Sequence, residues 1–113
     1  MNNKVLIIED ERELSELLKR FLIKKQYEVT CVENLNQAMH ALHMYLFDTI
    51  ILDNNLPDGK GIDIIPTIHA SQNKPTIIAM SALHIRDEVL NAGASYYIEK
   101  PISTAAIYQL MLR

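Results

Sequence analysis

The chain alternates short apolar runs with segments of helical periodicity, and this alternation repeats five times within 113 residues. The strand-like runs are residues 4–8, 27–32, 48–53, 75–80 and 95–99. The helix-like segments follow them at residues 14–22, 35–46, 61–70, 83–92 and 103–113. Such alternation predicts a parallel sheet with helices on both faces. Because crossovers are right-handed, the strand order 2-1-3-4-5 is favoured. We therefore expect one α/β domain over residues 1–113: a three-layer, doubly wound, five-stranded parallel sheet.

Residues at the ends of the helix-like segments support this arrangement. Asn34 and Ser103 are expected to be the N-caps of the second and the last helix. Gly93 is expected just beyond the end of the fourth helix. Pro66 should kink or shorten the third helix. The sequence stops within the last helix, which suggests that residues 1–113 are part of a longer chain.

Apolar stripes predict which sides of the first two helices pack inward. The first stripe recurs at helical spacing and consists of Leu14, Leu17, Leu18, Phe21 and Leu22. The second is expected to form the inner face of the helix over residues 35–46, with Ala38, Leu42, Tyr45 and Leu46.

The composition excludes several classes of protein. The formal net charge is −3, whereas nucleic-acid binding normally requires a basic patch. The single cysteine, Cys31, excludes an internal disulfide and a cysteine-rich zinc site. No apolar run is long enough to cross a bilayer, and no secretory signal precedes the first strand. We expect a cytoplasmic protein without nucleic-acid or membrane partners.

Chemically active side chains follow four of the strand-like runs. Glu9 and Asp10 follow the first run, and Asp53 ends the third. Ser81 follows the fourth run and Lys100 follows the fifth. Since the carboxyl ends of parallel strands meet at one edge of the sheet, these side chains should lie together. Three carboxylates at close range repel one another unless they share a cation, and Mg²⁺ suits such oxygen ligands.

Each of these residues also has an ordinary explanation when taken alone. Asp53 could end a turn, Ser81 could cap a helix, and Lys100 could be a solvated charge. Their combination matters, because phosphoryl transfer requires a nucleophile, a metal, an ammonium group and a hydroxyl donor in one place.

Four segments, V-L-I-I-E-D-E, L-D-N-N-L-P-D-G-K-G, A-M-S-A and N-A-G-A-S-Y-Y-I-E-K-P, make the chain resemble a response-regulator receiver domain of two-component signalling. The resemblance is to chemotaxis-regulator-like domains with the flavodoxin-like fold, and it covers essentially the whole chain. It implies that Asp53 accepts a phosphoryl group from the phosphohistidine of a sensor histidine kinase. Asp10 and Asp53 would bind Mg²⁺ directly, Glu9 would assist through water, and the backbone carbonyl of Asn55 would be a further ligand.

The resemblance also implies a switch. Ser81 would contact a phosphoryl oxygen, Lys100 would pair with the phosphoryl group, and Tyr97 would turn into the space that Ser81 leaves. The Lys100–Pro101 peptide bond would be cis. Glu9 and Ser81 stand where the family more often has Asp and Thr.

The surface that changes would comprise the fourth helix, the fifth strand and the fifth helix, including Ile85, Arg86 and Ile107. It would contact an output domain, a partner protein or a second copy in a homodimer. Such a domain is a phosphoacceptor that assists its own phosphorylation and dephosphorylation, and is not classed as an enzyme.

Three alternatives can be weighed from the sequence. A Mg²⁺-dependent phosphatase with an aspartyl nucleophile would use Asp53, but Asn55 replaces the second acid of its D-x-D signature. A receiver fold that binds partners without phosphorylation would not need the full set of acids with Ser81 and Lys100. A nucleotide-binding site is disfavoured, because residues 58–61 lack the spacing of a phosphate loop.

Overall fold

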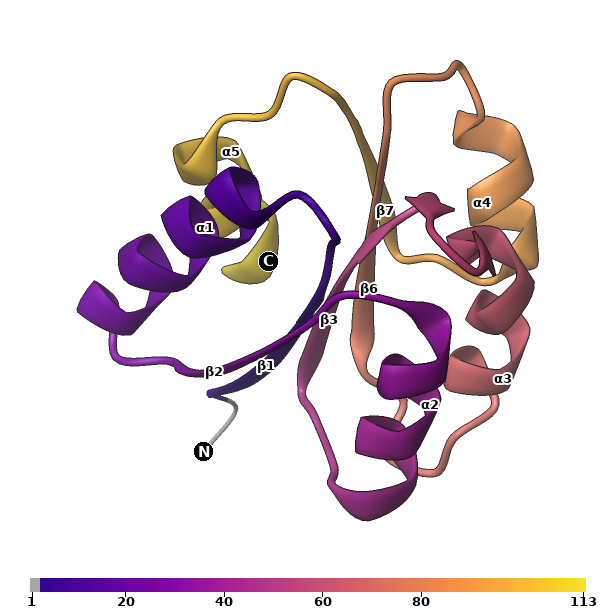
Figure 1. Cartoon of the computed structure of the whole chain (residues 1–113), viewed down its shortest axis with the longest axis horizontal. Helices are drawn as coiled ribbons and strands as arrows, with labels where there is room; N and C mark the ends of the chain where they lie inside the picture. Colours follow the sequence, from indigo (N-terminus) through magenta and orange to yellow (C-terminus); the bar gives the residue numbers. More distant parts are fainter. Residues whose placement is uncertain (1–2) are drawn as a thin grey trace.

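The computed structural model describes residues 3–113, which form one parallel sheet covered by helices on both faces (Figure 1). The strands of the main sheet are β1 (Lys4–Ile8), β2 (Glu28–Val32), β3 (Thr49–Asp53), β6 (Thr76–Ser81) and β7 (Tyr96–Glu99). Their order is β2-β1-β3-β6-β7, and all neighbours are parallel. The predicted fold and strand order are confirmed.

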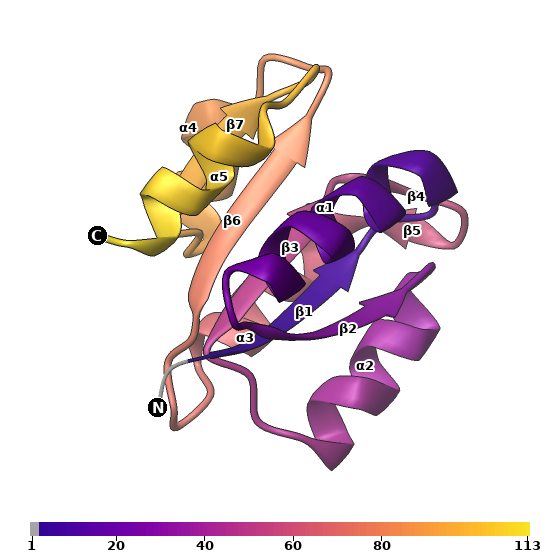
Figure 2. The same cartoon turned by 90° about the vertical axis from the view of Figure 1, so that its left-hand side faces the viewer.

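Two short strands follow β3 and form a separate antiparallel hairpin, β4 (Asn55–Leu56) and β5 (Gly59–Lys60). Figure 2 shows this hairpin near the ends toward which β1 and β6 point. The helices are α1 (Arg12–Lys24), α2 (Leu35–Met44), the 3-10 helix η1 (Gly61–Ile64), α3 (Ile65–His69), α4 (Arg86–Ala92) and α5 (Thr104–Met111).

Each face of the sheet carries its own apolar cluster. On one face, α1 and α5 pack against the sheet through Leu18, Leu22 and Ile107. On the other face, α2, α3 and α4 cover residues that include Ile50 and Leu52. Successive side chains of a strand point to opposite faces, so a strand between two helical layers is buried on both faces and its middle residues are apolar. All five residues of β3 are accordingly buried.

The predicted helix signals are found where the sequence placed them. The Asn34 side chain accepts a hydrogen bond from the Gln37 N–H at 2.7 Å, and Ser103 accepts one from the Ala106 N–H at 3.2 Å. Gly93 follows α4 with φ of 122°. Pro66 lies in the first turn of α3, which has only five residues after η1.

Two predicted helix boundaries are wrong. α2 ends at Met44, and the backbone is already extended at Tyr45. Tyr45 and Leu46 are therefore 61% and 70% exposed, not on the inner face, and Phe47 enters the core instead. α4 begins at Arg86 and not near residue 83. The loop before it is held out of the helix, because other side chains form hydrogen bonds to its backbone, as described below.

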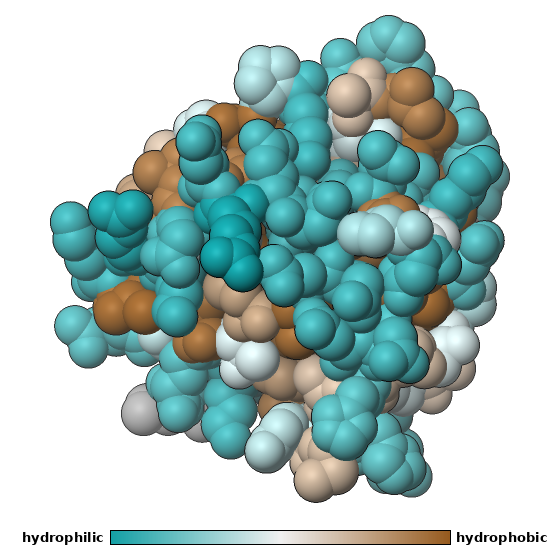
Figure 3. Space-filling model, viewed as in Figure 1, coloured by the Kyte–Doolittle hydropathy of each residue, from teal (hydrophilic) through white to brown (hydrophobic). Residues whose placement is uncertain are grey.

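The surface in Figure 3 is mainly hydrophilic, with separate apolar patches. Leu17 of the first predicted stripe is among the exposed apolar residues. None of the helices within residues 3–113 combines the length and apolar character that a membrane span requires.

Candidate functional site

The site lies at the carboxyl ends of the central strands. Glu9 and Asp10 come directly after β1, and Asp53 is the last residue of β3. Ser81 is the last residue of β6, and Lys100 comes directly after β7. The Lys100 N–H donates to the Ser81 carbonyl at 2.8 Å, which ties the ends of the last two strands together.

The Lys100 ammonium group bridges two buried carboxylates. Its Nζ lies 2.9 Å from Glu9 Oε1 and 3.1 Å from Asp53 Oδ1. Glu9 and Asp53 are only 1% and 3% exposed. The other Glu9 oxygen, Oε2, accepts the Glu11 N–H at 3.1 Å. Two acids are thus held near one base in a largely water-excluded site.

Burial sets the protonation properties of this group. Burial raises the pKa of Glu9 and of Asp53, and the hydrogen bonds from Lys100 only partly offset that rise. Burial by itself would lower the pKa of Lys100, but the two carboxylates outweigh it, so the pKa of Lys100 is raised. Neighbouring acids add to the cost of ionising Asp53, because Asp10 raises its pKa further. The single ammonium group of Lys100 therefore does not fully offset the cost of ionising these buried acids.

The acids also fit a hard divalent cation. Glu9, Asp10 and Asp53 each offer one carboxylate oxygen, and these oxygens lie within 4.8 Å of one another. Glu9 and Asp53 are buried, while Asp10 is exposed, so one side of the group faces solvent. Mg²⁺ takes few carboxylates and keeps several waters, which matches a group that is open on one side. This acidic group corresponds to the Mg²⁺ site that the resemblance to receiver domains implies.

The β4–β5 hairpin folds back onto the end of β3. The Asn55 backbone donates a hydrogen bond to Asp53, which lowers the pKa of that carboxyl and opposes the effect of burial. The neighbouring Asn54 is buried, and its side-chain oxygen accepts the Ile62 N–H at 2.9 Å. Asn54 is a structural residue that the sequence analysis missed, since a buried asparagine looks like any other turn residue in sequence.

Ser81 and Tyr97 organise the loop after β6. Ser81 is buried, and its Oγ accepts the Leu83 N–H at 3.0 Å. Tyr97 is also buried, and its hydroxyl donates to the carbonyls of Ser81, at 3.3 Å, and Leu83. The Arg86 guanidinium lies 5.3 Å from the centre of the Tyr97 ring. Tyr97 therefore lies inward, beneath the loop that leads to α4.

Not every residue expected on the surface of α4, β7 and α5 is there. Ile107 is fully buried in the α1–α5 cluster, so its assignment to a partner surface is wrong. Ile85 is half-buried against the opposite cluster, and Arg86 is exposed.

The Lys100–Pro101 peptide bond is cis.

Two further contacts near the site were not anticipated. The His84 Nδ1 lies 2.8 Å from Glu99 Oε1 and joins the loop after β6 to the end of β7. The Asp58 carboxylate accepts the N–H groups of Leu35 and Asn36 at 2.8 and 3.0 Å. Asp58 thereby caps α2 from the hairpin, and the hydrogen bond from Leu35 lowers its pKa.

The structural comparisons agree with this architecture. A two-component response regulator from Clostridium difficile superimposes with a TM-score of 0.91 at 25% identity, over 96% of this chain and 92% of that one. A response regulator from Burkholderia pseudomallei, determined with a phosphorylated aspartic acid and a calcium ion, has a TM-score of 0.87 at 22% identity, over 94% and 64%. At that identity the second likeness shows the fold alone.

The sequence comparisons identify the family. The transcriptional regulatory protein TctD of Salmonella typhimurium is 33% identical over 101 residues, which are 87% of this chain and 45% of TctD. The chain thus spans less than half the length of that relative. Residues 5–112 match the family model described as "Response regulator receiver domain". Because that match runs from within β1 to beyond the end of α5, the chain belongs to the response regulator receiver domain family of two-component systems.

Proposed function

We propose that this chain is a phosphorylation-dependent switch that accepts a phosphoryl group on Asp53. The observation that carries the proposal is the setting of the Asp53 carboxylate. It is buried at a strand end, lies 3.1 Å from the Lys100 ammonium group, and shares a cluster of oxygens with Glu9 and Asp10. A nucleophile held beside a cation and a metal-binding cluster suits phosphoryl transfer, in which positioning and charge stabilisation dominate.

Receiver domains partner with histidine kinases, and we take a kinase phosphohistidine to be the donor. An Asp53 oxygen forms the new bond to phosphorus as the bond between phosphorus and the imidazole nitrogen breaks, and the imidazole keeps that electron pair. Asp10, Asp53 and the Asn55 backbone carbonyl would hold Mg²⁺, with Glu9 assisting through water, and the ion would neutralise charge on the phosphoryl oxygens when bound. Lys100 supplies a second positive charge.

The Ser81 hydroxyl supplies the remaining donor. Its oxygen accepts the Leu83 N–H, so its own proton is available to a phosphoryl oxygen. When Ser81 turns toward that oxygen, it gives up the contact with Leu83, whose carbonyl is the partner of the Tyr97 hydroxyl. This chain of contacts supports a change that spreads from Asp53 through the loop after β6 to α4 and β7.

The changed surface of α4, β7 and α5 would be read by an output domain, a partner protein or a second copy of the chain. TctD is a transcriptional regulatory protein more than twice as long as its match, which supports residues 1–113 as the receiver part of a longer regulator. We place this activity in the cytoplasm. We class the domain as a phosphoacceptor that assists its own phosphorylation and dephosphorylation.

The proposal is tested by intact mass after incubation with acetyl phosphate and Mg²⁺. We expect one phosphoryl adduct that requires Mg²⁺ and is absent from Asp53→Asn. Asp58→Asn is the matched control, because it removes a nearby acid that caps α2 and lies outside the cluster. An adduct that persists in Asp53→Asn would refute the assignment of Asp53.

Two other outcomes would favour the alternatives. Failure of every tested donor, including a panel of kinases, despite Mg²⁺ binding would indicate a module that works without phosphorylation. Multiple turnovers of an added phosphate ester would indicate a phosphatase.

A further inference from the structure

One edge of the sheet carries unused hydrogen-bonding groups. β2 is the edge strand beside β1. The Glu28 N–H bonds to the Asn3 carbonyl at 2.8 Å, and the Val32 carbonyl accepts the Glu9 N–H at 3.0 Å. Because alternate residues of a parallel strand bond to the same neighbour, the backbone groups of Val29 and Cys31 point away from β1.

At the end of β2, one of these outward-facing backbone groups already has a hydrogen-bond partner placed as in an added strand. The next residue in that alternation, Glu33, donates its N–H to Gln37 Oε1 at 2.8 Å. An amide oxygen from α2 thus stands where the carbonyl of an added strand would stand. Val29 and Cys31, the two earlier residues of that alternation, offer the same kind of backbone N–H donor to a ligand.

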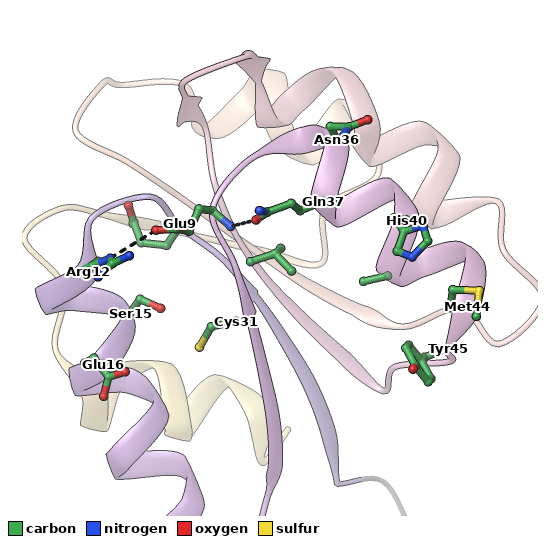
Figure 4. A pocket seen from close by; sticks show the side chains of 13 residues that line it. Glu9, Arg12, Ser15, Glu16, Cys31, Asn36, Gln37, His40, Met44 and Tyr45 are labelled. Carbon is green, nitrogen blue, oxygen red and sulfur yellow. Dashed lines mark hydrogen bonds and ion pairs between the residues drawn. The ribbon is translucent and has the colours of Figure 1, made fainter.

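A groove follows the edge of β2 between α1 and α2 (Figure 4). Its larger part has a volume of about 920 Å³ and is lined by Arg12 and Glu16 from α1, Cys31 from β2, and His40 from α2. A second part of about 220 Å³ is lined by Glu28 and Thr30. Tyr45 lines both parts, which together border residue 28 and residues 30–33 of this edge.

The groove walls combine apolar and acidic groups. Met44, Tyr45 and Leu46 are more than half exposed at the end of α2, and each lines at least one part of the groove. Four acids line the groove, against the two bases Lys4 and Arg12. Glu9 is paired with Lys100, and Arg12 with Glu33 at 3.5 Å, which leaves Glu16 and Glu28 as the acids without a described ion pair. An occupant with apolar and basic side chains complements such walls.

We propose that this groove binds an extended peptide segment of a partner protein, with alternating apolar and basic residues, as a sixth strand beside β2. Addition of a strand to a free edge draws affinity from main-chain hydrogen bonds and specificity from alternate side chains. A second copy of the chain fits less well, because its own α1 and α2 would meet the helices that flank the groove. The proposal is independent of phosphorylation at Asp53.

The test uses a seven-residue peptide of alternating lysine and valine, with blocked ends, and the ¹⁵N-labelled chain. Binding should slow amide hydrogen exchange at Val29 and Cys31 by about tenfold or more at saturation. The same peptide methylated on every interior backbone nitrogen should not bind, and a glutamate–valine peptide should bind much more weakly.

Two variants test where on the chain the peptide binds. Tyr45→Ser with Leu46→Ser should raise the Kd by about tenfold, which corresponds to the loss of one good apolar contact. Leu112→Ser removes a similarly exposed leucine from the end of α5 and should leave the Kd unchanged. Amide spectra of both variants establish that they remain folded.

Three results would overturn the proposal. The first is unchanged exchange at Val29 and Cys31 in the presence of saturating peptide. The second is equal binding of the lysine–valine and glutamate–valine peptides, which would remove the argument from charge. The third is protection of the same amides with rising protein concentration and no peptide, which would assign the edge to self-association.

Discussion

At the scale of single residues, Lys100 has two roles in the same place. It is the only base that contacts the buried carboxylates of Glu9 and Asp53 among the described ion pairs, and it is positioned to meet a phosphoryl group. Its contribution to stability can therefore be measured before any phosphoryl chemistry is tested.

Replacing Lys100 by methionine should destabilise the chain at pH 7 without metal. Glu9 and Asp53 would remain buried with no counter-charge, and we expect the free energy of unfolding to fall by about 3 kcal/mol. Urea denaturation in the presence of a chelator measures this loss. Lys60→Met, in the exposed hairpin strand β5, is the control. Added Mg²⁺ should recover part of the loss, and equal stability of Lys100→Met and the unchanged chain would refute this role.

The acid at position 53 should make stability depend on pH. Burial raises the pKa of Asp53 in the folded chain above its ordinary value of about 4. The folded state therefore holds the proton more tightly, and this stabilisation is complete below the ordinary pKa and is lost as the pH rises through the raised one. In metal-free buffer, the unchanged chain should lose stability relative to Asp53→Asn as the pH rises from about 4 through the raised pKa of Asp53.

Unfolding free energies of both proteins across that range test the sign of the effect. Glu9 is present in both proteins, but Asp53 contributes to its raised pKa, so the comparison measures Asp53 together with its effect on Glu9. A gain in the relative stability of the unchanged chain with rising pH would show that Lys100 lowers the pKa of Asp53 by more than burial raises it.

At the scale of elements, the hairpin after β3 determines how Asp53 is presented. The Gly61 N–H donates to the Asn54 carbonyl at 2.9 Å, which returns the chain to the end of the strand. A β-carbon at Gly61 would press against the Asp53 carbonyl oxygen and lie 3.0 Å from the Leu52 side chain. This close approach requires glycine.

Gly61→Ala should therefore disturb both stability and the site. We expect a loss of about 2 kcal/mol in the free energy of unfolding, as for other overpacked positions, with slower phosphoryl uptake by Asp53. Denaturation and the rate of adduct formation measure the two effects. Lys60→Ala changes the preceding exposed residue and should alter neither, and a fully stable Gly61→Ala would mean that the hairpin yields without cost.

At the scale of the whole molecule, burial depends on both faces of the sheet and not on helical periodicity alone. Leu17 and Leu22 belong to the same apolar stripe of α1, yet Leu17 is 55% exposed and Leu22 is fully buried. The stripe is wider than the surface that the sheet and α5 can cover.

Alanine substitutions should separate these two leucines. Leu22→Ala should lower the free energy of unfolding by about 3 kcal/mol, because it leaves a cavity in the core. Leu17→Ala should change it by no more than about 0.5 kcal/mol. Urea denaturation of the two variants gives the comparison directly, and similar losses would show that α1 lies closer to the sheet than described.

The fold class, the strand order and the strand ends that carry the acids, Ser81 and Lys100 were all predictable from the sequence. The strand order follows from the right-handedness of the crossovers between parallel strands. The strands and their polar ends follow from local patterns, since continuous apolar runs depend only on neighbours along the chain. The caps at Asn34 and Ser103 were predictable for the same reason. Periodicity could not show that α2 ends before Tyr45, because helix propensity continues where the chain must turn toward β3.

The contacts between groups that are distant along the chain depend on the folded arrangement and could not be predicted from the sequence. The bridge from Lys100 to Glu9 and Asp53, the cap of α2 by Asp58, and the burial of Ile107 all join segments that are distant in sequence. The free edge of β2 and its groove are likewise products of the assembled sheet. A side chain carries its chemistry wherever it is, but its pKa, its exposure and its partners are set by what packs around it.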